Sequence, residues 1–121
     1  MSLPPEAERL RIFIGESDKH DGRPLFETIV EEARRRHMAG ATVLHGVLGF
    51  GAHSRLHKAG ILRLSEDLPV VIEIVDRTDR IEALLPYLDE VVKEGLVTRE
   101  KVQVITYRHG HREEEGAETA E

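Results

Sequence analysis

The 121-residue chain fits one domain, and its core must be built from aliphatic side chains, because 40% of its residues are hydrophobic but only 4% are aromatic. The absence of cysteine excludes disulfides, thiolate nucleophiles and cysteine-based metal sites, and the net charge of −6 disfavours nucleic-acid binding. No signal-peptide pattern and no apolar run near the ~20 residues that cross a bilayer are present, so we expect a cytoplasmic protein.

The first half of the chain predicts a strand, a helix and a second strand. Residues 1–7 are expected to be flexible. Apolar and polar side chains alternate along Arg9–Gly15, as in a strand with one buried face. Pro24 suits the first turn of the helix that follows, and Gly40 is placed to end it. The Val- and Leu-rich segment Ala41–Phe50 predicts the second strand.

The second half predicts a loop, two further strands and a helix. A loop over residues 51–60 and a short extended piece lead to Leu68–Asp76, LPVVIEIVD, which has the strongest strand pattern in the chain. Apolar residues recur at helical spacing over Thr78–Glu94, where Pro86 is expected to bend the helix or make it restart. The last strand is expected at Lys101–Tyr107.

The order of these elements, β-α-β-β-α-β, predicts an α+β fold of the ferredoxin-like type over residues 8–110. With right-handed crossovers, both helices cover one face of a four-stranded antiparallel sheet. The other face also carries aliphatic side chains, so we expect an oligomer. The acid Glu73 inside the third strand needs a partner, and Arg11 on the first strand is the candidate. Residues 111–121 are rich in glutamate and have no apolar period, and they are expected to form a disordered tail.

The segment HGVLGFGAHSRLHKAG, residues 45–60, combines glycines with cations after the second strand. Glycines allow backbone N–H groups to approach a phosphate closely, but they also allow a strand to bulge and turn. The cations favour the phosphate interpretation, because arginine donates two hydrogen bonds to a phosphate and lysine adds a point charge. The segment is neither a Walker A motif nor a Rossmann turn. The candidate phosphate-binding residues are Gly49, Gly51, Ser54, Arg55, His57 and Lys58.

The same loop leaves other chemistry open. His53 and His57 would share a face if this piece were helical, so a divalent-metal site is an alternative, although no carboxylate lies between them as in an H-E-x-x-H site. Glu66 and Asp67 are expected to shape a turn, and the alternative is that they coordinate Mg²⁺ beside a nucleotide. Catalysis is disfavoured, because the chain has no G-x-S-x-G elbow and no acid placed to orient a Ser54–His57 dyad.

Two stretches carry a family resemblance: GFGAHSRLHKAGILRLSEDLPVVIEIVD and EGLVTREKVQVITY. Over residues 8–108 the chain resembles a branch of the nitrogen-regulatory PII superfamily known as domain of unknown function one-ninety. The resemblance implies a ferredoxin-like protomer, a homotrimer, and effector sites in the clefts between protomers. It also implies that Gly49–Lys58 and Gly95–Lys101 together hold a nucleotide, which adds Arg99 and Lys101 to the candidates. Unlike well-studied PII proteins, this chain has a short loop without a tyrosine, so control by uridylylation is not expected.

We therefore expect a PII-like sensor that is not an enzyme. It is expected to bind an adenine nucleotide (AMP, ADP or ATP, with or without Mg²⁺) or a similar anion. Binding is expected to order the loop after the second strand and so change a partner contact. The alternatives are a divalent-metal-binding trimer and an interaction scaffold without a ligand. The resemblance also implies a membrane transporter or channel as the regulated partner.

Overall fold

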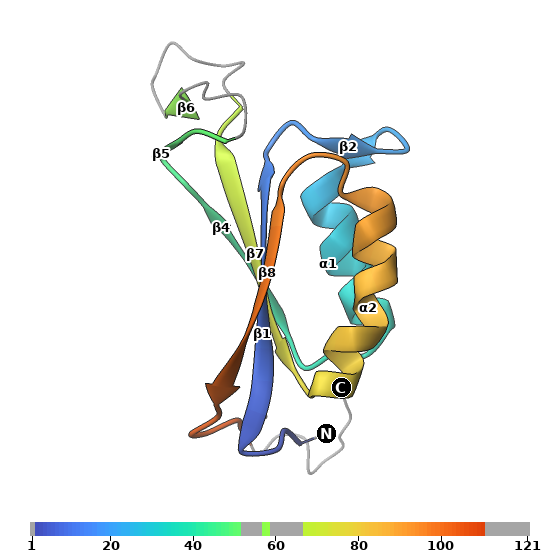
Figure 1. Cartoon of the computed structure of the whole chain (residues 1–121), viewed down its shortest axis with the longest axis vertical. Coiled ribbons are helices and arrows are strands. Elements are labelled where there is room, and N and C mark those ends of the chain that lie inside the picture. The colour runs from blue at the N-terminus through green and yellow to red at the C-terminus, as the bar shows by residue number, and fades with distance from the viewer. Residues whose placement is uncertain (1, 52–56, 59–66, 111–121) are drawn as a thin grey trace.

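The computed structural model describes residues 2–51, 57–58 and 67–110, and it shows a four-stranded antiparallel sheet with both helices on one face (Figure 1). In the sheet order β4-β7-β1-β8, the strands are Ala41–His45, Pro69–Asp76, Glu6–Gly15 and Leu96–Gln103. The helices are α1, Leu25–Arg35, and α2, Thr78–Val91. Two short hairpins pair β2 (Lys19–His20) with β3 (Arg23–Pro24) and β5 (Leu48–Gly49) with β6 (His57–Lys58). The predicted ferredoxin-like fold is confirmed.

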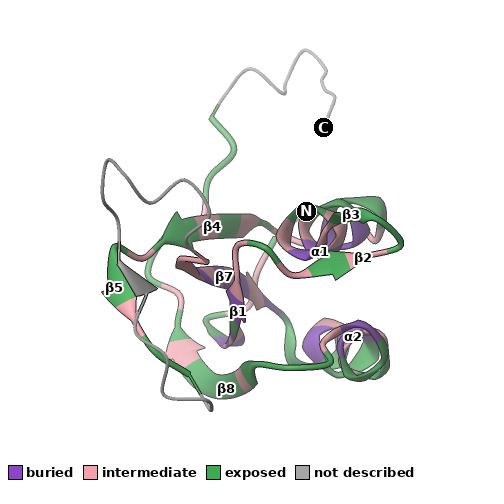
Figure 2. Cartoon of the chain, turned by 90° about the horizontal axis from the view of Figure 1, so that it is seen from above, coloured by how far each residue is buried: buried purple, intermediate pink, exposed green. Residues whose placement is uncertain are grey.

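The hydrophobic core lies between the sheet and the helix layer (Figure 2). β1 and β7 form the centre of the sheet, and every second side chain on each strand faces the helices and is buried. Ile29 of α1 and Leu84 of α2 pack against them and are completely buried. These core side chains are all aliphatic, as the composition required. The strand residues of this core cluster are Leu10, Ile12, Ile14, Val70, Ile72 and Ile74.

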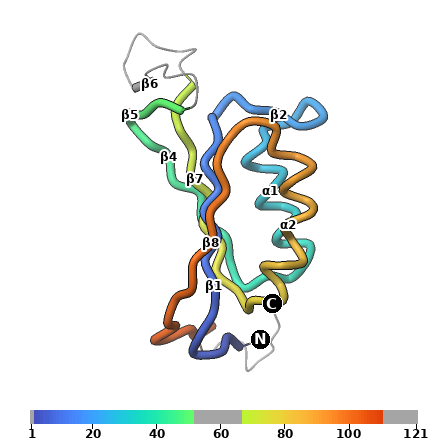
Figure 3. The backbone as a smooth tube through the Cα atoms, viewed as in Figure 1, coloured from blue at the N-terminus to red at the C-terminus, as the bar shows by residue number. Residues whose placement is uncertain are grey.

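The helix α1 ends earlier than predicted, at Arg35 rather than near Gly40, and the chain then turns back into β4 (Figure 3). His37 adopts a left-handed conformation with φ 60°, its N–H donates to the Arg34 carbonyl (2.9 Å), and the Met38 N–H donates to the Ala33 carbonyl (3.1 Å). This pair of bonds is the Schellman arrangement, which satisfies the last helix carbonyls. The prediction was wrong because it gave the left-handed position to glycine, whereas histidine also adopts it at modest cost.

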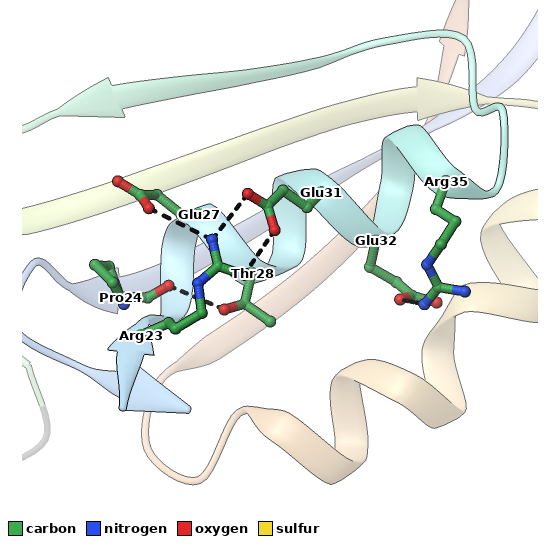
Figure 4. Close-up of polar contacts among 7 residues, drawn as sticks. All are labelled: Arg23, Pro24, Glu27, Thr28, Glu31, Glu32 and Arg35. Atoms are coloured by element: carbon green, nitrogen blue, oxygen red, sulfur yellow. Dashed lines mark hydrogen bonds and ion pairs between the residues drawn. The ribbon is translucent and has the colours of Figure 1, made fainter. Parts of the chain in front are cut away.

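The segment between β1 and α1 contains the β2–β3 hairpin. Asp21 and Gly22 both have positive φ, 52° and 79°, as the two central residues of a tight hairpin turn require. Figure 4 shows how this hairpin is tied to α1: both guanidinium nitrogens of Arg23 bond the two carboxylate oxygens of Glu31 at 2.8 Å, and Glu27 lies 3.8 Å away. These groups are exposed, so the pair contributes little stability, but it fixes the position of the hairpin relative to α1.

The last strand, β8, spans Leu96–Gln103 and not the predicted Lys101–Tyr107. It pairs with β1 along its whole length, from Phe13 opposite Leu96 to Glu6 opposite Gln103. Because β1 itself begins at Glu6, two of the residues expected to be flexible, Glu6 and Ala7, belong to the sheet. The strand β8 can start directly after Gly95, whose φ is 153° and where a Cβ would lie 2.5 Å from the Phe13 carbonyl oxygen. Only glycine fits there without strain.

The helix α2 continues through Pro86 and ends at Val91, so it does not restart at the proline and is three residues shorter than predicted. Pro86 lacks the N–H that would bond the Glu82 carbonyl, but Glu82 and Pro86 are exposed, so water can bond this carbonyl.

Two arginines link the helices where α1 ends. Arg36 donates to the Ala83 carbonyl of α2 (3.0 Å), and Arg80 donates to the carbonyls of Arg36 (2.9 Å) and His37 (3.1 Å). Neither helix has the length and apolar character needed to cross a membrane within the described ranges.

Candidate functional site

The sheet face opposite the helices carries four apolar residues in a row that crosses all four strands. Leu44 of β4 lies opposite Val71 of β7, Val71 opposite Phe13 of β1, and Phe13 opposite Leu96 of β8. Phe13, Leu44 and Leu96 are 37%, 48% and 56% exposed. We call these four residues the apolar row. Such a contiguous exposed row is typical of a surface that another protein covers.

Next to the apolar row, the same face carries two ion pairs. The Nε of Arg11 donates to the Glu73 carboxylate at 2.9 Å, which confirms the pairing predicted for this acid in a central strand. Two residues before Arg11 on β1, Arg9 forms an ion pair with Glu100 on the neighbouring strand β8. Each acid of these two pairs is therefore matched by an arginine of the same chain.

The predicted phosphate loop begins as a hairpin that extends beyond the sheet. β5 follows β4 and pairs with β6 so that Leu48 lies opposite Lys58 and Gly49 opposite His57. Part of the expected 51–60 loop is thus β-structure, because the two flanks of the loop pair with each other. Figure 2 shows β5 on the side of the sheet that faces away from both helices. The hairpin pairing places the backbones of two candidate residues, Gly49 and His57, side by side.

The glycines at the hairpin base have a packing role in this structure. The Gly46 N–H donates to the Pro69 carbonyl at 2.8 Å, and a Cβ on Gly46 would lie 2.8 Å from the Pro69 ring. A Cβ on Gly49 would lie 3.1 Å from the same ring, whereas among the described residues nothing lies within 4 Å of one on Gly51. Close approach to Pro69 therefore explains Gly46 and Gly49, whereas no described residue restricts a side chain at Gly51.

Several predicted residues lie outside the described part of the chain. They comprise three loop residues proposed to carry polar, charged or metal contacts, and one acid proposed for magnesium. The described backbone of His57 and Lys58 belongs to β6, and their side chains lie outside the described part as well. The three loop residues and the acid for which neither backbone nor side chain is described are His53, Ser54, Arg55 and Glu66.

Arg99 is held by two carboxylates of its own chain. Its Nε donates to Glu8 at 2.8 Å and its terminal nitrogen donates to Glu82 of α2 at 3.0 Å. These hydrogen bonds, first to Glu82 and then to Glu8, raise the pKa of Arg99 above its ordinary value. Glu8 is buried and also accepts from the Thr78 hydroxyl at 3.1 Å. Arg99 therefore ties β8 to α2, whereas Lys101 is exposed and makes no ion pair within the described ranges.

The two halves of the predicted site lie at opposite edges of the sheet. The β5–β6 hairpin continues from β4, which forms one edge, and Arg99 and Lys101 lie on β8, which forms the other. Figure 2 shows these two strands separated by β7 and β1. The described parts of the two halves therefore do not meet within one protomer.

Asp67 holds the turn that follows β1, whereas the turn predicted around Glu66 and Asp67 themselves lies mostly outside the described residues. Its Oδ1 accepts from the Ser17 N–H at 2.8 Å, and a Cβ on Gly15 would collide with its carboxylate at 2.6 Å. Asp18 accepts from the Gly15 N–H at 3.1 Å, and burial raises the pKa of the Asp18 carboxyl. His45 lies 3.6 Å from Glu16 at the same end of the sheet. Within the described ranges no three histidine or acidic side chains converge as metal ligands.

Sequence reasoning missed the course of the chain after β8. The segment Val104–Tyr107 was assigned to the last strand, but it crosses beside the sheet: the Val104 N–H donates to the Pro5 carbonyl at 2.7 Å, and the Tyr107 hydroxyl donates to the Ala39 carbonyl at 2.7 Å. Burial, and to a smaller extent Asp76, raise the pKa of Tyr107. A cavity of about 410 Å³ lies between this segment and the helix-free face. The sequence could not reveal that the chain leaves the strand here, because the alternating pattern of VQVITY also fits a continuing strand.

The chain matches one protein family and is similar in sequence to individual relatives. The family DUF190, described as Uncharacterized ACR, matches residues 7–104. A UPF0166 protein of Aquifex aeolicus is 36% identical over 98 residues, covering 79% of this chain and 90% of its own. A UPF0166 protein of Methanocaldococcus jannaschii is 39% identical over 93 residues, covering 76% and 85%.

Two solved structures share the fold at low sequence identity. CPII from Thiomonas intermedia K12, a nitrogen regulatory PII-like protein bound to ADP, AMP and bicarbonate, matches with a TM-score of 0.60 and 17% identity over 82% of this chain and 94% of that chain. A PII-like signaling protein from Thermus thermophilus matches with a TM-score of 0.59 and 20% identity, over 91% and 94%. The family match and these likenesses together show that the chain belongs to the DUF190 family and has the fold of PII-like proteins.

Proposed function

We propose that this protein is a cytoplasmic PII-like signalling protein that binds an adenine nucleotide or a similar anion between the protomers of a homotrimer. The observation that carries the proposal is the separation of the two candidate half-sites, the β5–β6 hairpin and β8, at opposite edges of one sheet. Opposite edges of the same sheet meet only when a second copy joins them. The similar protein CPII, which binds ADP and AMP, supports the choice of ligand class.

The apolar row provides the surface for that assembly. It crosses all four strands on the face that the helices leave open, and neighbouring acids on this face are already paired. Burying such a row contributes roughly 25 cal/mol for each Å² of apolar surface removed from water. A ring of copies that packs these faces together also brings one protomer's β4 edge towards another's β8 edge.

Within the shared site, the candidate residues have different roles. Gly51 leaves room for a ligand beside the backbone, since a Cβ there would meet no described atom within 4 Å. Lys101, which makes no ion pair among the described residues, offers a cation from the other edge, while Arg99 is already held by two carboxylates and acts through the position of β8. The remaining candidates would add polar and charged groups from the hairpin segment, namely Ser54, Arg55, His57 and Lys58. Mg²⁺ is the natural companion of a bound triphosphate.

The hairpin is also the surface that we propose to signal to a partner. Val47, Leu48 and Phe50 are 71%, 57% and 68% exposed, so the hairpin presents an apolar strip beside the proposed ligand. A ligand that binds one hairpin conformation more tightly shifts the population towards that conformation and changes the strip available to the partner. A membrane transporter or channel is the partner class we propose.

Calorimetric titration tests the site. The parent protein and the variants Arg55→Ala and Lys101→Ala are titrated with AMP, ADP and ATP, with and without Mg²⁺, at two salt concentrations. We expect each variant to lose about 1.5–3 kcal/mol of binding free energy, as for a charge-assisted hydrogen bond. Lys19→Ala, on the distant β2, is the matched control and is expected to bind like the parent. If the parent binds a nucleotide and both site variants bind equally well, the site lies elsewhere.

A further inference from the structure

The C-terminal end of α1 is a basic surface on an acidic protein. Three consecutive arginines, Arg34, Arg35 and Arg36, lie there, and Glu32 is the carboxylate that pairs with two of them, Arg35 and Arg36. Arg80 reaches this end from α2 and donates to the carbonyls of Arg36 and His37, the two residues that follow α1. Arg34 and Arg35 are exposed, and Arg34 makes no ion pair within the described ranges. We call the four residues Arg34, Arg35, Arg36 and Arg80 the basic end of α1.

A small apolar cavity adjoins this surface. It measures about 210 Å³ and lies between α1 and the edge strand β4, where Val30, Ala33 and Met38 line it and Arg34 stands at its rim. A cavity of this size accommodates small side chains next to the cations. The surface therefore fits an extended acidic peptide with small apolar residues.

The chain's own acidic segment has this composition. Residues 111–121, HREEEGAETAE, contain five glutamates against one arginine, with alanines at positions 117 and 120. The net charge of the segment is therefore −4, with histidine neutral, from five negative charges and one positive charge. The complementarity in charge and in side-chain size is the first argument that the two belong together.

The described chain leads this segment to the basic surface. The Tyr107 hydroxyl is bonded to the Ala39 carbonyl, and Ala39 lies only five residues beyond Arg34 in the connection from α1 to β4. Glu113 follows Tyr107 by six residues, which span at most about 20 Å when extended. The first glutamates can therefore reach the arginines without any rearrangement of the sheet or helices.

We propose that residues 111–121 dock on the basic end of α1 of the same chain, with glutamates against Arg34 and Arg35 and alanines at the adjoining cavity. Each exposed pair contributes little by itself, so the contact depends on several charges acting together and weakens as salt screens them. This surface lies on the helix layer and shares no residue with the proposed nucleotide site, so the inference does not rest on the proposed function.

The chain contains no cysteine, so Thr119→Cys creates a single attachment point for a spin label. In the full-length labelled protein, we expect paramagnetic broadening of the backbone amide signals of residues 34–40. The broadening is expected to disappear when salt is raised from about 0.01 M, where the Debye length is about 30 Å, to about 1 M, where it is about 3 Å.

Charge variants separate a specific contact from mere proximity. Arg34→Gln with Arg35→Gln is expected to abolish the broadening, and so is Glu113→Gln with Glu114→Gln and Glu115→Gln, which leaves the described fold untouched. The matched control, Lys19→Gln with Arg23→Gln at the other end of α1, is expected to retain it. Broadening that survives both charge variants, that falls on the β5–β6 hairpin, or that is absent from the parent overturns the proposal. Broadening passed from a labelled chain to an isotope-labelled chain in a mixture also overturns docking within one chain.

Discussion

Asp76 ends β7 with a completely buried carboxylate that holds two chain connections. Its Oδ2 accepts from the Ala39 N–H at 2.9 Å, in the connection between α1 and β4. Its Oδ1 accepts from the Arg77 N–H at 2.7 Å, at the start of α2. One side chain thereby fixes the ends of both helices relative to the central strand, and its removal should destabilise the fold strongly.

The magnitude follows from the two donors left behind. In the variant Asp76→Ala, the part-buried Ala39 N–H loses its acceptor, which costs about 1–3 kcal/mol, whereas the N–H of the exposed Arg77 can bond water instead. We therefore expect a loss of about 1–3 kcal/mol in the free energy of unfolding, a substantial part of the roughly 5–15 kcal/mol typical of a domain. Asp76→Asn keeps one acceptor oxygen but turns an amide donor towards the other N–H, so its loss should be roughly half as large.

Urea denaturation followed by circular dichroism, at one fixed protein concentration, measures these losses. Asp89→Ala on the exposed surface of α2 is the matched control and is expected to stay within about 0.5 kcal/mol of the parent. A loss for Asp76→Ala no larger than that of the control would refute the role assigned to the buried carboxylate.

Three further predictions address the oligomer, the metal alternative and an acid-sensitive pair. Phe13→Asp places a charge in the apolar row and should convert the assembly to monomers of 13.7 kDa by light scattering; a parent that is itself a monomer contradicts the trimer. If the loop binds zinc, the double variant His53→Ala with His57→Ala should lose a zinc-induced rise in melting temperature, and a parent without such a rise removes the idea. The hydrogen bond from Arg77 lowers the pKa of Asp79 from 3.8 to about 2, so the contribution of this pair is present above the ordinary pKa of 3.8 and lost as the pH falls towards 2. Arg77→Gln should return the Asp79 pKa towards 3.8 in a carboxyl NMR titration, and an unchanged pKa contradicts the pairing.

The fold could be predicted because the central strands are strictly patterned. β7 alternates buried and half-buried residues along its whole length, and β1 carries three consecutive inward aliphatic positions. The partner of Glu73 could be predicted for the same reason, since the alternation places Arg11 on the same face of the neighbouring strand.

The elements that were misplaced depend on contacts distant in sequence. β8 contains the charged run Thr98–Lys101, which has no strand pattern by itself and becomes a strand because β1 offers a full-length partner. The end of α1 was misplaced because His37 takes the conformation usually given to glycine.

The candidate site was predicted only in part. The hairpin pairing of Gly49 with His57 and the engagement of Arg99 by Glu8 both follow from register and tertiary packing, which residue spacing does not encode. Local composition therefore identified a promising loop but could not separate a glycine that packs on Pro69 from one that has room beside it.

The register of the central strand also constrains biosynthesis. Among the strands of this sheet, β1 is the first to leave the ribosome, yet its partners are β7 and β8. Glu6, for example, cannot pair until Gln103 has been synthesised. The sheet therefore cannot close until nearly the whole domain has been synthesised, and its contacts are dominated by long loop closures that slow folding. Until then, the aliphatic face of β1 lacks its partners in the nascent chain, and unpaired strands of this kind are prone to aggregate.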